Sequence, residues 1–296
     1  MSVSLRVTQR SIADRALLGL QGNLDRLSTL QQQLSSGKAI SQPSDSPMGT
    51  ISALQLRADI TQNAQWSRNA QDGLGWLGSI DNALSSATTM VSRARDLTLQ
   101  GNNTGFASQQ ARDAMATEVD QIRNALIGIA NTKYLNRPVF GGTTTSSTAY
   151  DANGNYLGDS NPVARTVGSN SQVRVESTGP EVFGTGGSSL FQVLANISTD
   201  LRTNPSQLGA DLNSLDSASN LMMSQTADVG TRYQRLNQMR QAADDKQLNL
   251  KASLSGVEDI DLPKTMMNLQ MQQVAYQAAL GATAKVIQPS LLDFLK

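Results

Sequence analysis

The chain has 296 residues, without histidine or cysteine, and its 24 Lys and Arg residues balance 24 Asp and Glu residues. The lack of thiolates and imidazoles excludes disulfides, zinc sites with sulfur or nitrogen ligands and histidine-dependent catalytic triads. The balanced charge creates no overall field that would attract nucleic acid or an anionic membrane surface. The composition therefore argues against an enzyme and favours neither nucleic acid nor membrane as a partner. We expect no cofactor, no metal and no small-molecule substrate.

The apolar content is modest and is spread along the chain. No window approaches the roughly 18–20 uninterrupted apolar residues that cross a bilayer. The N-terminal stretch lacks a continuous apolar segment followed by a cleavage site, so we expect no cleaved signal peptide. Aromatic residues make up only 4% of the chain, which suits thin helix bundles better than a wide sheet core. We therefore expect a mostly helical protein.

The first helix is predicted over residues 13–36, where leucines recur at intervals of three and four and Gln31 fills one gap. Gly37 then provides a left-handed C-cap, and residues 43–47 form a turn into the next helix. This narrow seam cannot offset the entropy of ordering its own helix, so it needs a partner. Its residues are Leu17, Leu20, Leu24, Leu27 and Leu34.

Four more helices are predicted between the two ends of the chain. A long one carries a seam from Trp66 to Ala94 and stops at Gly101–Asn103. Residues 108–133 form the next, and these two are expected to make an antiparallel hairpin. Helical periodicity returns over residues 190–201, and one helix of about fifty residues follows Pro205.

Residues 135–188 have a different character, because Gly, Thr, Ser and Asn accumulate there and the apolar period falls to two. Asn153-Gly154 predicts a type I′ hairpin turn. Strands are predicted at residues 138–140, 163–167 and 172–175. The glycine-rich residues 184–187 lack the companions of a phosphate-binding loop, so we interpret them as a linker back to the helices.

The last helix repeats the four-three rhythm from Leu262 to Ile287, with Gln273 in its seam, and carries a second apolar stripe beside the first. One partner helix cannot cover both stripes, which favours packing between copies of the chain in a ring or tube. An ordinary bundle core within one chain remains the alternative. The subunit-packing residues predicted here, besides the five leucines above, are Leu262, Met266, Leu269, Met271, Val274, Tyr276, Leu280, Ile287, Leu291, Leu292 and Phe294.

The nested order of these segments predicts the fold class. It is mostly α with a small β insertion, and both the N- and C-terminal parts form a long, coiled-coil-like helical bundle. The expected domains are the terminal helices (1–45 and 261–296), a helical bundle (46–135 and 188–260) and a β-rich domain (136–187).

Two short polar patterns receive structural interpretations. Ser35–Lys38 matches a Ser-x-x-Lys spacing but lacks the companion motifs of such enzymes, so we interpret it as a helix C-terminus with a favourable cation. Glu258, Asp259 and Asp261 do not have the spacing of a calcium loop. They are expected to be solvated charges, or acids that precede the last helix.

Both ends of the chain resemble the bacterial flagellin-like family. Residues 24–49, LDRLSTLQQQLSSGKAISQPSDSPMG, are similar to its leucine heptad, Leu-Ser-Ser-Gly-Lys and Pro-Ser-Asp-x-Pro-x-Gly. Residues 271–295, MQQVAYQAALGATAKVIQPSLLDFL, resemble the ending of its junction subunits and not the flagellin ending rich in Gln-Ala-Asn. Residues 134–143, YLNRPVFGGT, resemble its entry into a β domain. Ser46 replaces the usual second Asp, and residues 136–139 interrupt the entry strand.

The resemblance implies a structural role without catalysis or cofactor. It implies an extracellular flagellar subunit, exported through the type III pathway, whose C-terminal helix binds an export chaperone beforehand. The subunits would form a ring of like copies between the first junction ring, above the hook, and the flagellin filament. Two alternatives stay open, namely flagellin itself and, from a different class, a helical pore-forming toxin or adhesin.

Overall fold

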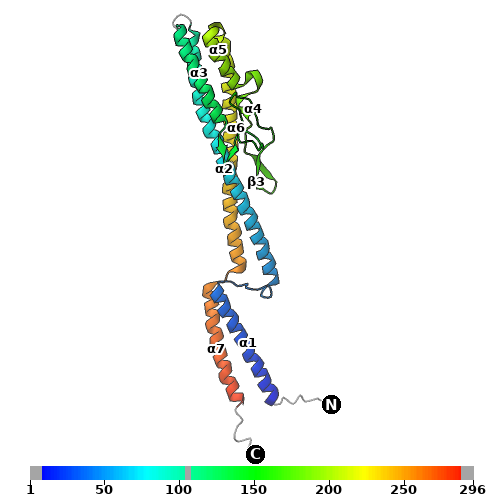
Figure 1. Ribbon diagram of the computed structural model, residues 1–296. Coiled ribbons are helices and arrows are strands. Elements are labelled where there is room, and N and C mark those ends of the chain that lie inside the picture. Colours follow the sequence, from blue (N-terminus) through cyan, green and yellow to red (C-terminus); the bar gives the residue numbers. More distant parts are fainter. Residues whose placement is uncertain (1–8, 104–107, 288–296) are drawn as a thin grey trace, which may run out of the picture. The chain divides into compact units, whose positions relative to one another are not determined.

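The computed structural model describes residues 9–103 and 108–287, which divide into two compact units. The terminal unit comprises the chain up to Thr61 together with the part from Leu248 onward, and the bundle unit comprises Gln62–Gln247. Helices dominate, and the only strands of the described residues lie mid-chain, so the predicted fold class is confirmed (Figure 1). The finer division into three domains stays a prediction. None of the helices in the described part is both long and apolar enough to cross a bilayer.

Two long helices contribute to both units. Helix α2 spans Pro47–Asn102 and helix α6 spans Leu208–Glu258, which has the length predicted for it. In the bundle unit they run antiparallel, since Arg95 Nε lies 2.6 Å from Asp216 Oδ1 and the Asn63 amide lies 2.6 Å from the Ala243 carbonyl. Leu77, Leu84, Val91, Leu215, Met222 and Val229 are among the buried side chains of their shared core.

Two shorter helices complete the bundle beside α2 and α6 (Figure 1). Helix α3 (Gln109–Ala130) begins at Ser108, whose hydroxyl accepts from the Ala111 N–H. An Arg93–Glu118 ion pair of 2.7 Å links it to α2, so the predicted hairpin of these two helices is confirmed. Helix α5 (Leu190–Thr203) packs against α3 and buries Leu194, Ile197 and Leu201.

A small β insertion follows α3. Strands β1 (Lys133–Tyr134) and β2 (Arg137–Pro138) pair through a two-residue turn in which Leu135 and Asn136 have φ angles of 47° and 65°. Positive φ at both central residues is the signature of a type I′ turn. Residues 136–139, which interrupt the family's entry strand in the sequence, therefore belong to a complete hairpin. The strand predicted at residues 138–140 is wrong beyond Pro138, where β2 ends.

The type I′ turn predicted at Asn153-Gly154 is also wrong. Of these two residues only Gly154 has a positive φ, at 85°. The turn is wider, because the Gly154 N–H donates to the Asp151 carbonyl at 3.1 Å and the Asp151 N–H donates to the Asn155 carbonyl at 3.0 Å. The Asp151 carboxylate also accepts from two backbone N–H groups of the turn, an arrangement that competes with the tighter hairpin.

The remaining insertion is a second hairpin and a short helix that pack on the bundle. Strands β3 (Ala164–Gly168) and β4 (Ser171–Arg174) confirm the other two predicted strands to within one residue. Helix α4 (Gly179–Phe183) and the 3₁₀ turn η1 (Gly186–Ser188) lead into α5, and the 3₁₀ turn η2 (Pro205–Gln207) leads into α6. The aromatic rings of Phe140, Tyr150, Phe183 and Phe191 meet edge to face or tilted and join the insertion to the core.

Two carboxyl groups meet where α5 and α6 begin to pack together, and they make the bundle unit sensitive to pH. Burial, helped by the neighbouring Asp200 carboxyl, raises the pKa of Asp211 to about 6. The folded state therefore binds a proton that the unfolded chain releases above its own pKa near 3.8, so stability falls as the pH rises from about 4 to about 6.

We expect Asp211→Asn to remove most of this pH dependence, because an amide cannot ionise. Thermal unfolding of the full chain between pH 4 and pH 7 measures it, with Asp216→Asn as the matched control on the same helix. The Arg95 partner lowers the pKa of Asp216, so loss of that group removes stability present at higher pH. A D211N variant with an unchanged pH profile would contradict the assignment.

Candidate functional site

The terminal unit holds two helices that pack side by side and antiparallel, α1 (Gln9–Ser36) and α7 (Leu262–Ile287) (Figure 1). Each turns a half-buried inner face toward its partner, and the members of each face are spaced by three and four residues. The inner face of α1 comprises Ala16, Leu20, Asn23, Leu27, Leu30 and Leu34, and that of α7 comprises Thr265, Leu269, Gln272, Tyr276, Ala279 and Thr283.

The predicted seams coincide with these inner faces at every second position only. Leu20, Leu27, Leu34, Leu269 and Tyr276 are half-buried. At the positions between them, the inner face contains the residue that directly precedes the predicted one. Ala16 therefore takes the place of Leu17, and Asn23 takes the place of Leu24. The other predicted leucines and methionine of the seams, which lie outside the inner faces, are 44–52% exposed, and their role in packing between subunits stays a prediction. They are Leu17, Leu24, Leu262, Met266 and Leu280.

A polar contact lies within the inner faces. The Gln272 side-chain amide is 3.2 Å from both the backbone carbonyl and the side-chain oxygen of Asn23. Gln31 and Gln273, which were predicted to occupy the seams, are exposed instead. A polar pair amid apolar contacts penalises any slip that would leave it unpaired, so this contact sets the register of the two helices.

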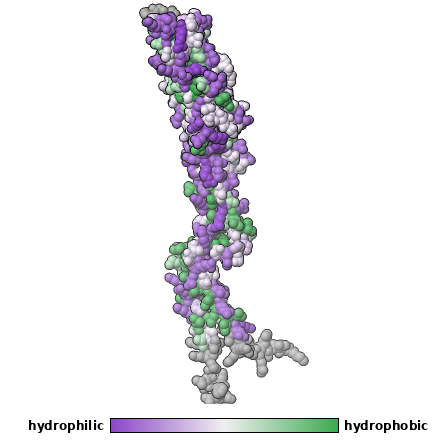
Figure 2. Space-filling model, viewed as in Figure 1, coloured by the Kyte–Doolittle hydropathy of each residue, from purple (hydrophilic) through white to green (hydrophobic). Residues whose placement is uncertain are grey.

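The large apolar side chains of α1 and α7 are mostly exposed, and Figure 2 shows hydrophobic residues gathered over this pair of helices. A groove of about 500 Å³ lies between the helices, lined by residues that include Leu30 and Met271. Apolar surface of this kind on a stable protein marks contact with another surface. We refer to Leu17, Leu18, Leu24, Leu262, Met266, Met267, Met271, Val274 and Leu280 as the outer apolar residues.

Four of the predicted packing residues lie outside what the structure describes. They are the side chain of Ile287, at the end of α7, and the residues Leu291, Leu292 and Phe294. Subunit packing by the whole predicted set stays a prediction.

A connector, residues 37–46, joins α1 to α2 and is held by the residues between α6 and α7. Gly37 has a φ of 71° and its N–H donates to the Gln33 carbonyl at 2.8 Å, so the predicted left-handed C-cap is confirmed. The Ala39 N–H donates to the Glu258 carbonyl at 2.6 Å, and the Ile260 N–H donates to the Gly37 carbonyl at 3.1 Å. Residues 37–39 and 258–260 therefore form a short antiparallel backbone bridge between the N-terminal and C-terminal parts of the chain.

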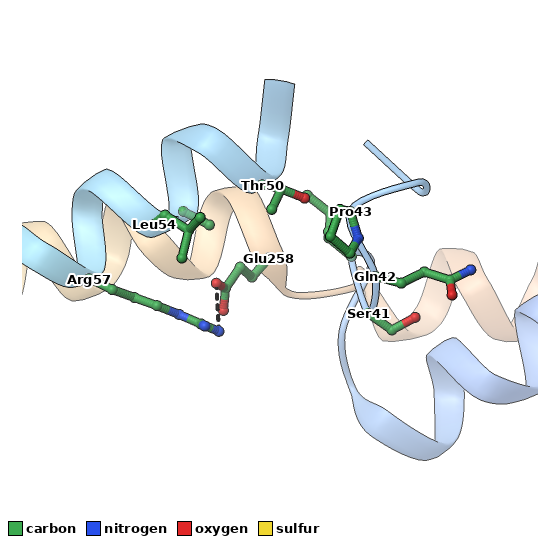
Figure 3. A pocket seen from close by; sticks show the side chains of 9 residues that line it. Ser41, Gln42, Pro43, Thr50, Leu54, Arg57 and Glu258 are labelled. Carbon is green, nitrogen blue, oxygen red and sulfur yellow. Dashed lines mark ion pairs between the residues drawn. The ribbon is translucent and has the colours of Figure 1, made fainter. Parts of the chain in front are cut away.

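Ion pairs reinforce this bridge. Glu258 is only 5% exposed, and its carboxylate lies 2.8 Å from the Arg57 guanidinium, as Figure 3 shows, and 3.4 Å from Lys38 Nζ. Lys38 also lies 2.6 Å from Asp259, an ion pair that raises the pKa of the lysine and lowers that of the aspartate. The prediction that these acids are solvated is wrong for Glu258, whereas Asp261 caps α7 as one alternative proposed.

The turn before α2 is built around two short polar side chains. The Asp45 carboxylate accepts from the N–H groups of Ser41 and Gln42 at 2.9 and 3.0 Å, which lowers its pKa. The Ser46 hydroxyl accepts from the Gly49 N–H at 3.1 Å, so this serine caps α2 in place of the family's aspartate. A Cβ atom at Gly49 would lie 2.4 Å from Ile40 Cδ1, so any larger residue there would displace the Ile40 side chain.

The concave space in this region is small. Its pocket, shown in Figure 3 between Pro43, Thr50, Leu54 and Glu258, has a volume of about 110 Å³. Sites for small molecules usually measure about 300–1,000 Å³. Within the described residues no cluster of three or more acidic side chains could hold a metal ion. The most prominent feature of the terminal unit is instead the exposed apolar surface of α1 and α7.

Comparison with known proteins identifies the family. The bacterial flagellin N-terminal helical region matches residues 7–145, and the C-terminal helical region matches residues 212–295. The chain belongs to the bacterial flagellin family. The family consists of structural proteins of the flagellum, so the predicted resemblance is confirmed and the chain is a flagellar component.

Similar proteins within this family carry two kinds of name. Flagellar hook-associated protein 3 of Salmonella typhimurium is 25% identical over 93% of this chain and 95% of its own length. Flagellin of Bacillus subtilis is also 25% identical, over 96% of this chain and 97% of its own. Sequence identity alone therefore does not show whether this chain is closer to the hook-associated proteins or to the flagellins.

Solved structures support the fold. Flagellar hook-associated protein 3 of Legionella pneumophila superimposes with a TM-score of 0.62 at 17% identity, covering 69% of this chain and 98% of that one. FlgL of Bacillus cereus gives a TM-score of 0.59 at 19% identity, covering 67% and 97%. The two solved chains are therefore matched over nearly their whole length, and this chain over about two thirds of its length.

The buried carboxylate of the connector yields a testable prediction. Glu258→Ala removes the acceptor shared by Lys38 and Arg57, and hydrogen bonds to charged groups contribute about 1.5–3 kcal/mol each. We expect faster amide hydrogen exchange at Ala39 and Ile260, by about tenfold or more. Asp259→Ala is the control, because it removes an exposed ion pair that contributes about 1 kcal/mol or less. An equal or larger effect of D259A would contradict the role of Glu258.

Proposed function

We propose that this chain is a structural subunit of the flagellar hook–filament junction. In this proposal a ring of like copies connects the first junction ring, above the hook, to the flagellin filament. The observation that carries it is the match to hook-associated protein 3 along nearly the whole of both chains. The sequence after Met271, which resembles junction subunits and not flagellin, supports the same branch.

The outer apolar residues supply the physical means of assembly. Leu17 and Leu24 on α1 are each 50% exposed, and Met271 and Val274 on α7 are 58% and 66% exposed. Covering such side chains is worth about 25 cal/mol per Å² of apolar area removed from water. Identical subunits that meet through two different surfaces form a ring when the rotation closes. We infer that neighbouring copies cover these residues.

The same surface accounts for the proposed partners. An apolar helix face needs shielding before assembly, so an export chaperone would bind α7 while the chain is still in the cytoplasm. Export through the flagellar type III pathway, without a cleaved signal peptide, would then deliver an extracellular subunit. After export, the first junction protein and flagellin would be the neighbours above and below the ring of like copies.

Substitution of exposed apolar residues tests the proposal without disturbing the fold. We expect Leu24→Gln combined with Val274→Gln to leave thermal unfolding nearly unchanged, because both side chains are at least half exposed. The variant should fail to restore swimming in a strain that lacks its own copy of this chain, and flagellin should accumulate in the medium. Leu157→Gln, at a site 48% exposed in the β insertion, is the matched control.

Normal swimming with the double variant would refute the role of these residues. Loss of swimming with L157Q as well would show that the effect is not specific to the terminal helices.

Flagellin is the second candidate, because the Bacillus subtilis protein matches this chain at the same identity. Seeded assembly separates the two. We expect the purified full chain, added to short filament fragments, to cap their ends without lengthening them, because a junction subunit bridges two different neighbours. Electron microscopy measures the filament length, and purified flagellin is the positive control. Growth of long filaments from this chain alone would assign it to the flagellin branch.

A further inference from the structure

The β insertion and the start of α5 enclose a pocket that the proposed assembly role does not use. It has a volume of about 440 Å³, within the range of about 300–1,000 Å³ that is usual for small-molecule sites. One wall is formed by residues 153–155 of the turn, and another by residues 184–186 of the glycine-rich stretch after α4. The sequence singled out both segments without giving either a function.

The floor of the pocket is aromatic and firmly packed. The Tyr150 ring lies with its centroid 4.9 Å from Phe191 and 5.3 Å from Tyr156. The Tyr156 hydroxyl lies 2.8 Å from the Asp159 carbonyl and 3.0 Å from the Phe140 carbonyl, which fixes that ring. A ligand would meet a surface that is already in place, so little ordering cost would be added on binding.

The rim of the pocket is polar and exposed, and Arg123 fixes the backbone that carries it. Asn153, Thr185 and Gln192 line the mouth. The Arg123 guanidinium donates to the backbone carbonyls of Asn153 and Phe191, and so ties the turn to α5. Gly154 closes the space between them, because a Cβ atom there would lie 2.7 Å from Phe191 Cβ. The rim side chains are therefore presented from a rigid frame.

The pocket is electrically neutral. None of the described residues that line it is Asp, Glu, Lys or Arg. Burial raises the pKa of Tyr156 to about 12, and burial also raises the pKa of Tyr150, so both phenols stay protonated near neutral pH. An anion would find no countercharge in this lining, and neither would a cation. Amides and hydroxyls, by contrast, both donate and accept hydrogen bonds.

We propose that this pocket binds a neutral carbohydrate. Tyr150 and Phe191 are only 3% and 1% exposed, so the half-buried Tyr156 is the aromatic side chain that meets the apolar face of a sugar ring. The amides and hydroxyls of the rim pair with the sugar's hydroxyl groups. A single sugar has few atoms, so its Kd is expected to be on the order of millimolar. Longer neutral glycans gain affinity only as far as they contact the exposed rim.

The test is a titration of the ¹⁵N-labelled full chain with glucose, galactose and N-acetylglucosamine, followed by amide chemical shifts. At least one neutral sugar should shift the resonances of residues 153–155, 185–186 and 192 together. Glucosamine and N-acetylneuraminic acid, which carry charge, should bind more weakly. No shift with any neutral sugar, or tighter binding of a charged one, would overturn the proposal.

Three variants locate the binding. Asn153→Ala should weaken it by about three- to tenfold, the effect of one lost hydrogen bond. Gln192→Trp should abolish it by filling the mouth. Gln172→Ala, an exposed residue of β4 that does not line the pocket, should leave it unchanged. Binding that persists unweakened in both N153A and Q192W would place the sugar elsewhere and refute the site.

Discussion

The terminal unit depends on one short backbone bridge between the two ends of the chain. Lys38 and Asp259 pair there although 221 residues separate them. Closing so long a loop is costly in conformational entropy. Most of this entropy is already lost when the bundle unit folds, because the Asn63 side-chain amide then donates to the Gln247 side-chain oxygen at 3.1 Å. Once α2 and α6 are paired, only short segments remain to be closed, and two backbone hydrogen bonds with a buried carboxylate are sufficient to close them.

The bridge also determines how α1 and α7 meet. Helix α1 ends beside it and α7 begins beside it, so the bridge fixes which end of α1 faces which end of α7. The Asn23–Gln272 contact then confirms a single register. Because the bridge and this contact already align the helices, the inner faces can be small and partly polar, with Ala16 and Thr265 among their members. Such a pair is aligned well but buries little apolar area of its own.

The sequence was sufficient for the long helices, since α1, α2 and α6 have sustained periodicity, Gly37 marks the end of α1 and Pro205 precedes the start of α6. It was insufficient where distant residues decide. Leu135 has a positive φ that a branched side chain rarely adopts, so no local rule predicts that turn. Glu258 belongs to an acidic run that is typical of a solvated surface. Its burial depends on Arg57, which no pattern within the run reveals.

The difference between the predicted seams and the inner faces of α1 and α7 is itself informative about function. Counting large apolar residues selects the positions that are richest in leucine and methionine, and half of those positions lie outside the helix pair. A pair that folded only for itself would bury its largest side chains and expose its smallest. Here Ala279 is half-buried while neighbouring Leu280 is 44% exposed. This inverted distribution fits a sequence that encodes two interfaces at once. The inner one aligns α1 with α7, and the outer, more apolar one is the surface that we propose neighbouring copies cover.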